Sequence, residues 1–245
     1  LVARGHDVTL YEKQDRLGGL LNDATQLPFK GYMRGYLAWD IKTTLACGAK
    51  ICLNTEVTEE RVAKEDPDAV IVATGSTYLK PPIPGIDHPK VKAVRDVDGK
   101  SVDVGDTVVG AGLSGVECAL ALAQEGKKVT VIDMIPAEDF CATMPIFNKA
   151  DLFDQLEKGG VQLVGNVKIK AFTDGGVEAV DGDGNDVLFA GDAYVNALGV
   201  APNGKLGLAL MAKYGTDVYM VGDCVGKGRN YMDANQEAYH AAMRI

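Results

Sequence analysis

The segment between Thr107 and Asp133 constrains the fold of this chain more than any other feature. A short β-branched run, Thr107–Val109, enters the glycine-rich sequence Gly110–Gly115, which fits G-x-G-x-x-G. A helical pattern with one apolar face follows, and a second strand-like run, Lys128–Ile132, ends at Asp133. The glycine spacing alone is a weak signal, but strand, turn, helix and strand in this order indicate a nucleotide-binding α/β unit.

Each residue type in this loop has a physical role in binding a dinucleotide. Gly110 permits a tight turn, Gly112 lets backbone amides approach a pyrophosphate, and Gly115 allows the helix to pack closely on the strand. Leu113 and Ser114 open the helix, whose free N–H groups and positive dipole end attract phosphate. The sequence therefore predicts a dinucleotide site, and the alternative is a glycine-rich turn that binds nothing.

Asp133 indicates which dinucleotide this site prefers. It follows Gly110 by 23 residues, where an acidic side chain accepts hydrogen bonds from a ribose diol. Met134 and Ile135 come next, so no Arg or Lys stands beside it to neutralise a 2′-phosphate. We therefore expect NAD(H) rather than NADP(H).

Strand-like and helical runs alternate along the rest of the chain, as in doubly wound parallel sheets. The pattern predicts strands at 8–11, 50–53, 69–73, 161–164, 192–196 and 217–221 and helices at 32–47, 114–125, 147–158 and 233–244. Short runs with Gly/Asp turns at 168–189 predict a small antiparallel β-meander. The proline-rich stretch Lys80–Gly85 predicts a linker, because proline fixes φ and cannot donate to a ladder.

These elements predict an α/β fold of two Rossmann-like doubly wound domains, one inserted into the other. The first domain would comprise residues 1–84 and 205–245, and the inserted domain residues 85–204. The chain begins at Leu1 without methionine, and Leu1–Asp7 has the pattern of a helix end running into a turn. We therefore expect it to belong to a longer protein, with the first strand and glycine-rich loop of the outer domain upstream.

Composition excludes several classes of partner. The net charge of −9 has no compensating Lys/Arg cluster, so we expect no nucleic-acid partner. No apolar run approaches the roughly 18–20 residues of a membrane span, and we expect no membrane partner. The cysteines show no C-x-x-C pair or metal-ligand spacing, which favours reduced thiols in a cytoplasmic protein and no metal site. These cysteines are Cys47, Cys52, Cys118, Cys141 and Cys224.

A second set of candidate residues lies at the ends of other strand-like runs. Glu12 ends the first run, where it would be the ribose-binding acid of the outer domain. The remaining candidates are the glycines and strand-end residues Gly18, Gly19, Thr74, Gly75, Gly199, Gly222 and Asp223. Glu12 alone reads as a solvated strand-end carboxylate, and the combination of these residues favours a nucleotide-binding role.

The order of these motifs resembles that of flavoproteins with two dinucleotide-binding domains. In particular, Arg4–Lys13, Ala69–Ser76, Gly110–Glu117, Ala197–Asn203 and Val221–Cys224 are similar to the C-terminal part of multidomain NADH:flavin oxidoreductases of the Old Yellow Enzyme type. That group includes 2,4-dienoyl-CoA reductase, trimethylamine dehydrogenase, enoate reductases and bile-acid-inducible flavin oxidoreductases. The resemblance spans essentially the whole chain.

The resemblance implies an enzyme that relays electrons. NADH would dock on the inserted domain and reduce FAD in the outer domain, with Glu12 at the FAD ribose and Asp223 near its pyrophosphate and ribityl chain. Electrons would pass on through a [4Fe–4S] cluster to FMN in an upstream TIM-barrel domain, with both cofactors outside this chain. The cofactors supply the chemistry in such a relay, so no side chain is expected to act as a general base.

Two alternatives stay open at this point. The chain resembles, more distantly, the electron-transfer module of glutamate synthase small subunits or a ferredoxin:NAD(P) reductase. It could also be a non-catalytic module that holds ADP or a dinucleotide. The absence of C-x-x-C argues against disulfide reductases that share the two-domain plan, because they need a redox-active cysteine pair.

Overall fold

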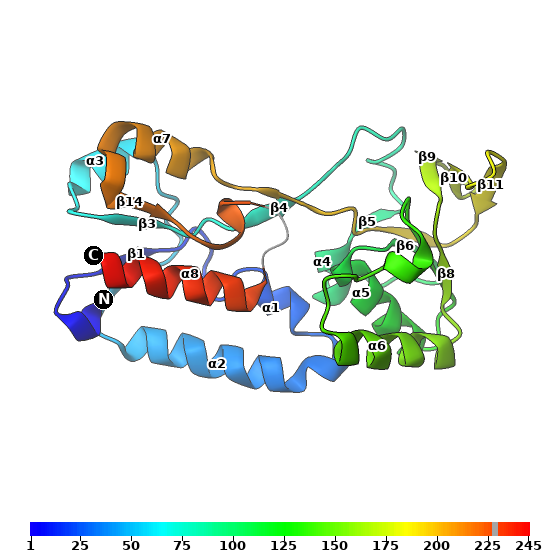
Figure 1. The fold of residues 1–245 in the computed structure, drawn as a ribbon, viewed down its shortest axis with the longest axis horizontal. Coiled ribbons are helices and arrows are strands. Elements are labelled where there is room, and N and C mark those ends of the chain that lie inside the picture. Colours follow the sequence, from blue (N-terminus) through cyan, green and yellow to red (C-terminus); the bar gives the residue numbers. More distant parts are fainter. Residues whose placement is uncertain (227–229) are drawn as a thin grey trace. The chain divides into compact units, whose positions relative to one another are not determined.

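The computed structural model describes residues 1–226 and 230–245, and the chain forms two compact units (Figure 1). Unit 1 comprises Leu1–Gly19, Tyr36–Thr77 and Val200–Ile245, and unit 2 comprises Leu20–Gly35 and Tyr78–Gly199. Both contain parallel strands with helices, so the predicted α/β class is confirmed. Among the helices of residues 1–226 and 230–245, none is long and apolar enough to cross a membrane.

Unit 2 is built on a five-stranded parallel sheet with the order β5-β12-β6-β7-β8. These strands are β5 (Val91–Ala93), β12 (Ala193–Asn196), β6 (Thr107–Gly110), β7 (Val129–Ile132) and β8 (Gln162–Val164). Every residue of β6 and β12 is buried, as expected for central parallel strands that are covered on both faces.

The helices of unit 2 are α1 (Leu21–Ala24), α4 (Val94–Asp98), α5 (Leu113–Gln124) and α6 (Ile146–Lys158), with 3₁₀ turns η2 (Pro28–Lys30) and η3 (Ala137–Asp139). Helices α4 and α5 pack against strands of the sheet, whereas α1 contacts α4 and α6 contacts α5. On α5, Val116 and Leu120 pack with Val109 of β6 and Val131 of β7 in one core. The predicted apolar face of this helix is therefore the face that holds the glycine loop against the sheet.

The predicted meander forms a separate three-stranded antiparallel sheet in unit 2. Its strands are β9 (Lys168–Phe172), β10 (Val177–Val180) and β11 (Asp186–Phe189). Asp181 closes the β10–β11 turn, because its carboxylate accepts the backbone N–H groups of Asp183 and Asn185.

Unit 1 contains two separate pairs of parallel strands. One pair is β1 (Thr9–Tyr11) with β2 (Lys50–Cys52), and the other is β3 (Val70–Val72) with β14 (Val218–Met220). Its helices are α3 (Glu59–Glu65), α7 (Lys205–Tyr214), α8 (Tyr231–Arg244) and the part of α2 (Gly31–Ala46) from Tyr36 onward, with 3₁₀ turns η1 (Val2–Arg4), η4 (Gly215–Asp217) and η5 (Gly222–Cys224). The strands β4 (Ser76–Tyr78) and β13 (Val200–Pro202) pair where the chain passes between the units.

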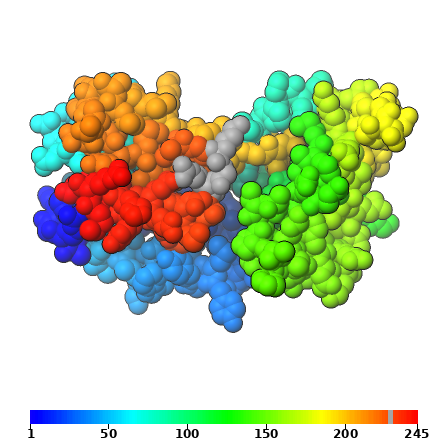
Figure 2. Space-filling model, in the orientation of Figure 1, coloured from blue at the N-terminus to red at the C-terminus, as the bar shows by residue number. Residues whose placement is uncertain are grey.

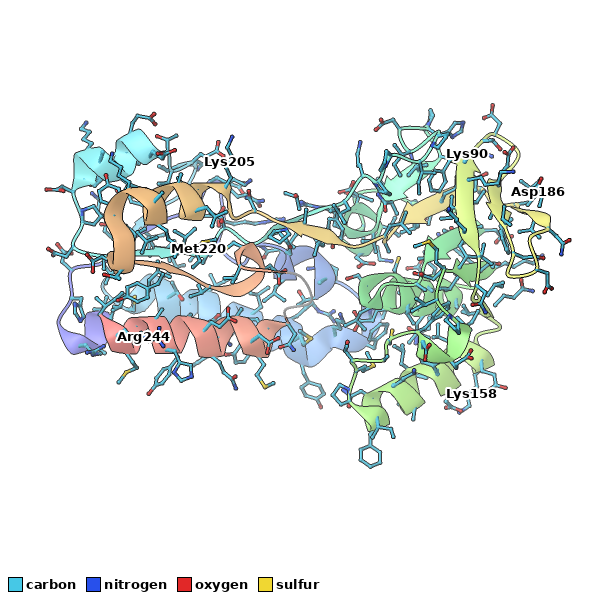
Figure 3. The ribbon with its side chains drawn as sticks, turned by 45° about the horizontal axis from the view of Figure 1, so that its top comes forward. Lys90, Lys158, Asp186, Lys205, Met220 and Arg244 are labelled. Atoms are coloured by element: carbon cyan, nitrogen blue, oxygen red, sulfur yellow. The ribbon has the colours of Figure 1, made fainter. Side chains whose placement is uncertain are left out.

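Packing in unit 1 is closest between α7 and β14. Helix α7 begins at Lys205, and its Gly207 lies so near Met220 that an added Cβ would be 2.7 Å from the Met220 sulfur (Figure 3). A cluster around Val72, Leu210 and Val218 forms the small core of this half of the unit.

Most long elements agree with the sequence prediction within one or two residues. Helix α2, predicted at 32–47, spans Gly31–Ala46 and is followed by Gly48 at φ +94°. Residues 80–85 form no helix or strand, as expected of the proline-rich stretch. The prediction omitted α3, α4, α7 and β5, which are short or carry no clear apolar period.

Candidate functional site

The Gly110–Gly115 loop joins β6 to α5, and a Cβ atom added to any of its three glycines would meet neighbouring atoms at 3.0 Å or less. A Cβ on Gly115 would collide with the Gly110 carbonyl oxygen and lie 2.8 Å from the Ala197 Cβ. A Cβ on Gly112 would lie 2.7 Å from the Ala197 carbonyl oxygen, and one on Gly110 would lie 3.0 Å from the Leu198 side chain. The loop therefore packs against the end of β12.

The N-terminus of α5 leaves its first amides without a partner inside the helix. The first N–H that bonds within the helix is that of Val116, to the Gly112 oxygen at 2.9 Å. The amides of Leu113, Ser114 and Gly115 consequently have no intrahelical acceptor. No side chain of the described residues caps this end, and Leu113 and Ser114 are exposed. This arrangement can accept an anionic group such as phosphate.

The loop also lies at the topological switch point of the sheet. From β6 the chain continues to β7 and β8 on one side, whereas β12 and β5 lie on the other. Ligands of open parallel sheets bind beyond the carboxyl ends of the strands at this point. Gly199 follows β12 there, is exposed, and has φ +104°, which a residue with a side chain adopts only under strain.

Asp133 follows β7, the strand next to β6, so it shares this edge of the sheet with the loop. The Asp133 carbonyl oxygen accepts a hydrogen bond from the N–H of Val167, which follows β8, at 2.8 Å. The carboxylate is half-buried, and one oxygen has a long contact of 3.4 Å with the Ile135 N–H. Capacity to accept further hydrogen bonds remains, as a ribose diol requires.

In unit 1, Thr74 and Gly75 follow β3 and are held by Asn203. The Thr74 hydroxyl donates to the Asn203 carbonyl oxygen at 2.6 Å, and the Asn203 N–H donates to the Gly75 oxygen at 2.9 Å. Gly75 has φ +66°. Asn203 belongs to the motif at 197–203 but was not among the predicted site residues. Its contact with Thr74 joins segments 129 residues apart, which a local sequence pattern does not reveal.

Gly222 and Asp223 follow β14, the neighbour of β3. Gly222 has φ +70°, and its N–H donates to the Glu237 carboxylate of α8 at 2.8 Å. The Asp223 carboxylate accepts the Ser76 hydroxyl at 2.9 Å. The structure therefore brings Thr74, Gly75, Gly222 and Asp223 to the carboxyl edge of one strand pair.

Glu12 lies at the equivalent edge of the other strand pair. Its carboxylate accepts the Gln14 N–H at 2.8 Å, and its own N–H donates to the Cys52 oxygen at 2.9 Å. Gly18 and Gly19 follow in a turn, with φ of +110° and +51°.

A buried polar cluster behind the loop was not predicted. The Lys30 ammonium lies 2.6 Å from the Glu117 carboxylate of α5, and both side chains are largely buried. Asp98, at the end of α4, is 4% exposed, and in the part of the chain that the structure describes its Oδ1 has no hydrogen-bond partner. Burial raises the pKa of Asp98 to about 7, against a hydrogen bond from Cys118 that lowers it.

In this structure Cys47, Cys52, Cys118, Cys141 and Cys224 are free thiols. Cys224 is buried, and its sulfur contacts the carbonyl oxygens of Val72 and Val221 at 3.2 and 3.1 Å, which is a packing role. Residues 1–226 and 230–245 contain no group of three or more His, Cys, Asp or Glu side chains that could hold a metal ion.

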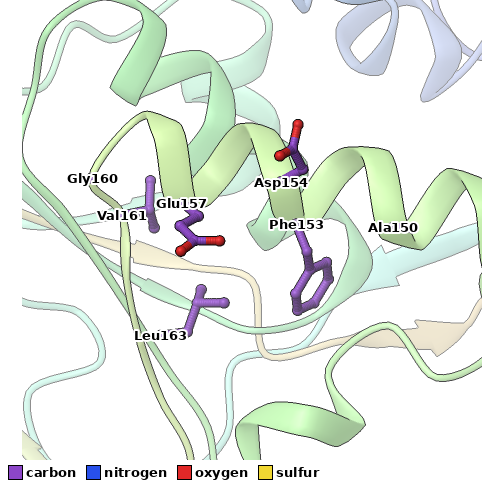
Figure 4. Close-up of a pocket in the computed structure, with 7 residues that line it drawn as sticks. All are labelled: Ala150, Phe153, Asp154, Glu157, Gly160, Val161 and Leu163. Carbon is purple, nitrogen blue, oxygen red and sulfur yellow. The ribbon is translucent and has the colours of Figure 1, made fainter.

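A surface hollow of about 620 Å³ lies elsewhere in unit 2, between α6 and the residues that lead into β8 (Figure 4). Phe153, Val161 and Leu163 form its apolar wall, with Asp154 and Glu157 at the side. It includes none of the loop residues, so it is separate from the candidate nucleotide site.

A parallel sheet with a glycine-rich loop, an uncapped helix N-terminus and a strand-end acid defines a dinucleotide-binding α/β protein. Residues 29–243 match the family model described as pyridine nucleotide-disulphide oxidoreductase. The chain belongs to this family.

Named relatives share nearly the whole chain. Identity is 34% over 98% of the chain with a bilirubin reductase of Mediterraneibacter gnavus, and 31% over 99% with an NADH oxidase of Thermoanaerobacter brockii. A solved structure of 2-naphthoyl-CoA reductase is 31% identical over 99% of the chain, with a TM-score of 0.88. The chain spans only 37%, 38% and 37% of these three proteins.

Proposed function

We propose that the Gly110–Gly115 loop binds the pyrophosphate of NAD(H). The observation that carries this proposal is the pair of exposed residues Leu113 and Ser114 at the uncapped start of α5, whose amides have no intrahelical acceptor, in a loop whose glycines pack too closely on β12 for Cβ atoms. Asp133 would accept the adenosine ribose hydroxyls, and Gly199 would keep the end of β12 open for the rest of the ligand.

The remaining predicted site residues would hold FAD in unit 1. Glu12 would accept the adenosine ribose hydroxyls, while the strand-end turns of Thr74–Gly75 and Gly222–Asp223 would line the pyrophosphate and ribityl chain, with Gly18 and Gly19 nearby in sequence. Their support is positional, because residues at carboxyl ends of parallel strands are where such sheets bind nucleotides.

The domain bounds expected from the sequence are residues 85–204 for the inserted NAD domain and residues 1–84 with 205–245 for the FAD domain, and units 2 and 1 correspond to them except at Leu20–Gly35 and at the two junctions. When bound, the two cofactors supply hydride transfer from nicotinamide to flavin, and the chain binds and aligns them. In the larger protein, electrons would continue through an iron–sulfur cluster to FMN in a TIM barrel. The chain covers little more than a third of reductases and oxidases similar to it, which leaves room for such domains.

An equilibrium titration with NADH, followed by nicotinamide fluorescence, tests the proposed site. Gly112→Ala should weaken binding roughly tenfold or more, about 1.4 kcal/mol, because the added Cβ forces the loop away from the Ala197 oxygen. Gly35→Ala is the matched control, since nothing lies within 4 Å of its Cβ position. Equal NADH affinity for parent and Gly112→Ala would refute the assignment.

The same titration with FAD present separates an electron-transfer module from a non-catalytic one. Loss of the flavin absorption on adding NADH without oxygen supports hydride transfer. NADH binding that leaves bound flavin oxidised would instead favour a structural nucleotide site.

A further inference from the structure

Strand β8 leaves one edge of the five-stranded sheet of unit 2 open. Among the described residues, β8 pairs with β7 and with no other strand. The Asp133 N–H donates to the Val164 oxygen at 3.2 Å, so the backbone of Val164 faces β7. Neighbouring residues of a parallel strand face opposite sides, and Leu163 therefore directs its N–H and C=O groups away from β7. An unpaired edge of this kind is a template for another strand.

The β8 edge lacks the charges that the other edges of the two unit 2 sheets carry. Those edge strands each contain a charged residue, which is Lys92 in β5, Lys170 in β9 and Asp186 in β11. Residues 159–167, which include β8, contain no charged side chain. Charges on an edge strand discourage pairing with another chain, so this edge is open and also unprotected.

The hollow of about 620 Å³ lies directly beside this edge (Figure 4). Phe153 of α6 and Leu163 of β8 both line it, and both pack against the buried core of unit 2 while remaining partly exposed. Helix α6, light green in Figure 2, forms part of the outer surface of unit 2. An open strand edge with an apolar hollow next to it gives an incoming strand both backbone partners and side-chain contacts.

One stripe of α6 has a charge pattern that complements itself. Lys149, Phe153 and Glu157 follow one another at intervals of four residues, so they share one face of the helix. The Lys149 ammonium lies 5.2 Å from the centroid of the Phe153 ring and donates to the Glu138 carbonyl oxygen. Among the described residues, the Glu157 carboxylate takes part in no ion pair, and the neighbouring Lys158 pairs elsewhere. The α6 stripe is therefore positive, aromatic and negative in turn.

A two-fold axis through Leu163 satisfies the strand edge and the α6 stripe together. Across this axis β8 meets its copy in an antiparallel pair, where the N–H and C=O of Leu163 bond to those of Leu163 of the partner subunit. The two α6 helices then run antiparallel beside each other. Phe153 and Leu163 line the same hollow, so the axis passes near Phe153, with Lys149 and Glu157 about 6 Å away in opposite directions along the helix. Lys149 of each copy thus lies opposite Glu157 of the partner subunit.

We propose that this surface of unit 2 is a self-association interface, in which a second copy of the chain pairs β8 with β8 and α6 with α6. The occupant is a second copy because the surface complements itself. Leu163 supplies both backbone groups of the central strand pair, and the α6 stripe supplies both partners of each ion pair. The interface does not include the Gly110–Gly115 loop, so it stands independently of the proposed function.

Sedimentation velocity over a series of protein concentrations tests this interface. The parent chain should dimerise below about 100 µM. Glu157→Lys should raise the dimer Kd at least roughly tenfold, because each of its two ion pairs becomes a pair of lysines, and Lys149→Glu should act likewise through pairs of glutamates. An equimolar mixture of these two variants should dimerise like the parent, because the heterodimer restores both ion pairs. Asp151→Lys is the matched control, since it makes the same charge change as Glu157→Lys on the opposite side of α6.

Hydrogen–deuterium exchange locates the contact. The Leu163 amide should exchange rapidly in the monomer and at least roughly tenfold more slowly in the dimer. The Val164 amide, which faces β7, is the internal reference and should be protected in both. A chain that stays monomeric up to about 100 µM would overturn the proposal and would leave the edge to a strand of another protein. A dimer whose Leu163 amide exchanges as fast as in the monomer, or a variant mixture that stays monomeric, would overturn it as well.

Discussion

Replacing Asp98 with asparagine should change how the stability of unit 2 depends on pH. Asp98 is 4% exposed at the end of α4, and among the described residues its Oδ1 finds no hydrogen-bond donor. Burial disfavours the charged form and raises the pKa of this carboxyl from 3.8 to about 7, although the Cys118 thiol and Lys30 act in the opposite direction. Between these two pKa values, the Asp98 carboxyl therefore keeps its proton in the folded protein and releases it in the unfolded chain.

The sign and size of the effect follow from linkage. Between about pH 4 and pH 7 the folded state binds more protons than the unfolded state, so the free energy of unfolding falls as pH rises. A pKa difference of roughly three units, at 1.36 kcal/mol each, corresponds to about 4 kcal/mol. Below this window the stabilisation is complete, and above it the dependence on this group is flat.

Urea denaturation between about pH 4 and pH 8 measures this contribution. The parent should lose stability across the window relative to Asp98→Asn, whose amide has no charge to bury. Asp183→Asn, in the exposed β10–β11 turn, is the matched control and should follow the parent. If the Asp98→Asn and parent curves run parallel from pH 4 to pH 8, the carboxyl ionises as freely as an exposed one and the reasoning is wrong.

Two further outcomes are expected. Gly115→Ala should lower the free energy of unfolding by about 1–3 kcal/mol, because the added Cβ would collide with the Gly110 carbonyl oxygen and the Ala197 side chain. Thermal denaturation measures this loss, and a melting temperature equal to that of Gly35→Ala would contradict it. Lys30→Met should lower the free energy of unfolding by roughly 1–3 kcal/mol, because it leaves the largely buried Glu117 carboxylate without a partner. Adding Glu117→Gln should recover part of this loss, and a double variant that recovers none would argue against the ion pair.

Local patterns were sufficient to predict the elements that carry the dinucleotide site. The unit that carries the site is consecutive in sequence: a strand, the glycine spacing from Gly110 to Gly115 and a helix with an apolar face. This order of elements predicts the strand–turn–helix fold directly. The end of β7 at Asp133 follows from the same unit. The α2 helix was predicted from apolar side chains at helical spacing and from Gly48 after it, even though Leu37 is its only buried residue.

Contacts between distant segments could not be predicted in this way. Lys30 reaches Glu117 across 87 residues, and nothing in either neighbourhood indicates the partner. Asp98 reads as an ordinary charged residue before a glycine, and its burial depends on how α4 packs on α5. Short elements such as α3 are stabilised by tertiary packing and by the Thr58 cap, so their sequence period is weak.

The comparison of NADH with NADPH as ligands of the 245-residue chain tests the central claim most directly. With Asp133 at the ribose and no cation beside it, NADH should bind at least roughly tenfold more tightly than NADPH in calorimetric titrations. Asp133→Ala should reduce this preference by weakening NADH. A chain that binds NADPH as tightly as NADH, or binds neither, would contradict the assignment of the Gly110–Gly115 loop and Asp133 as an NAD site.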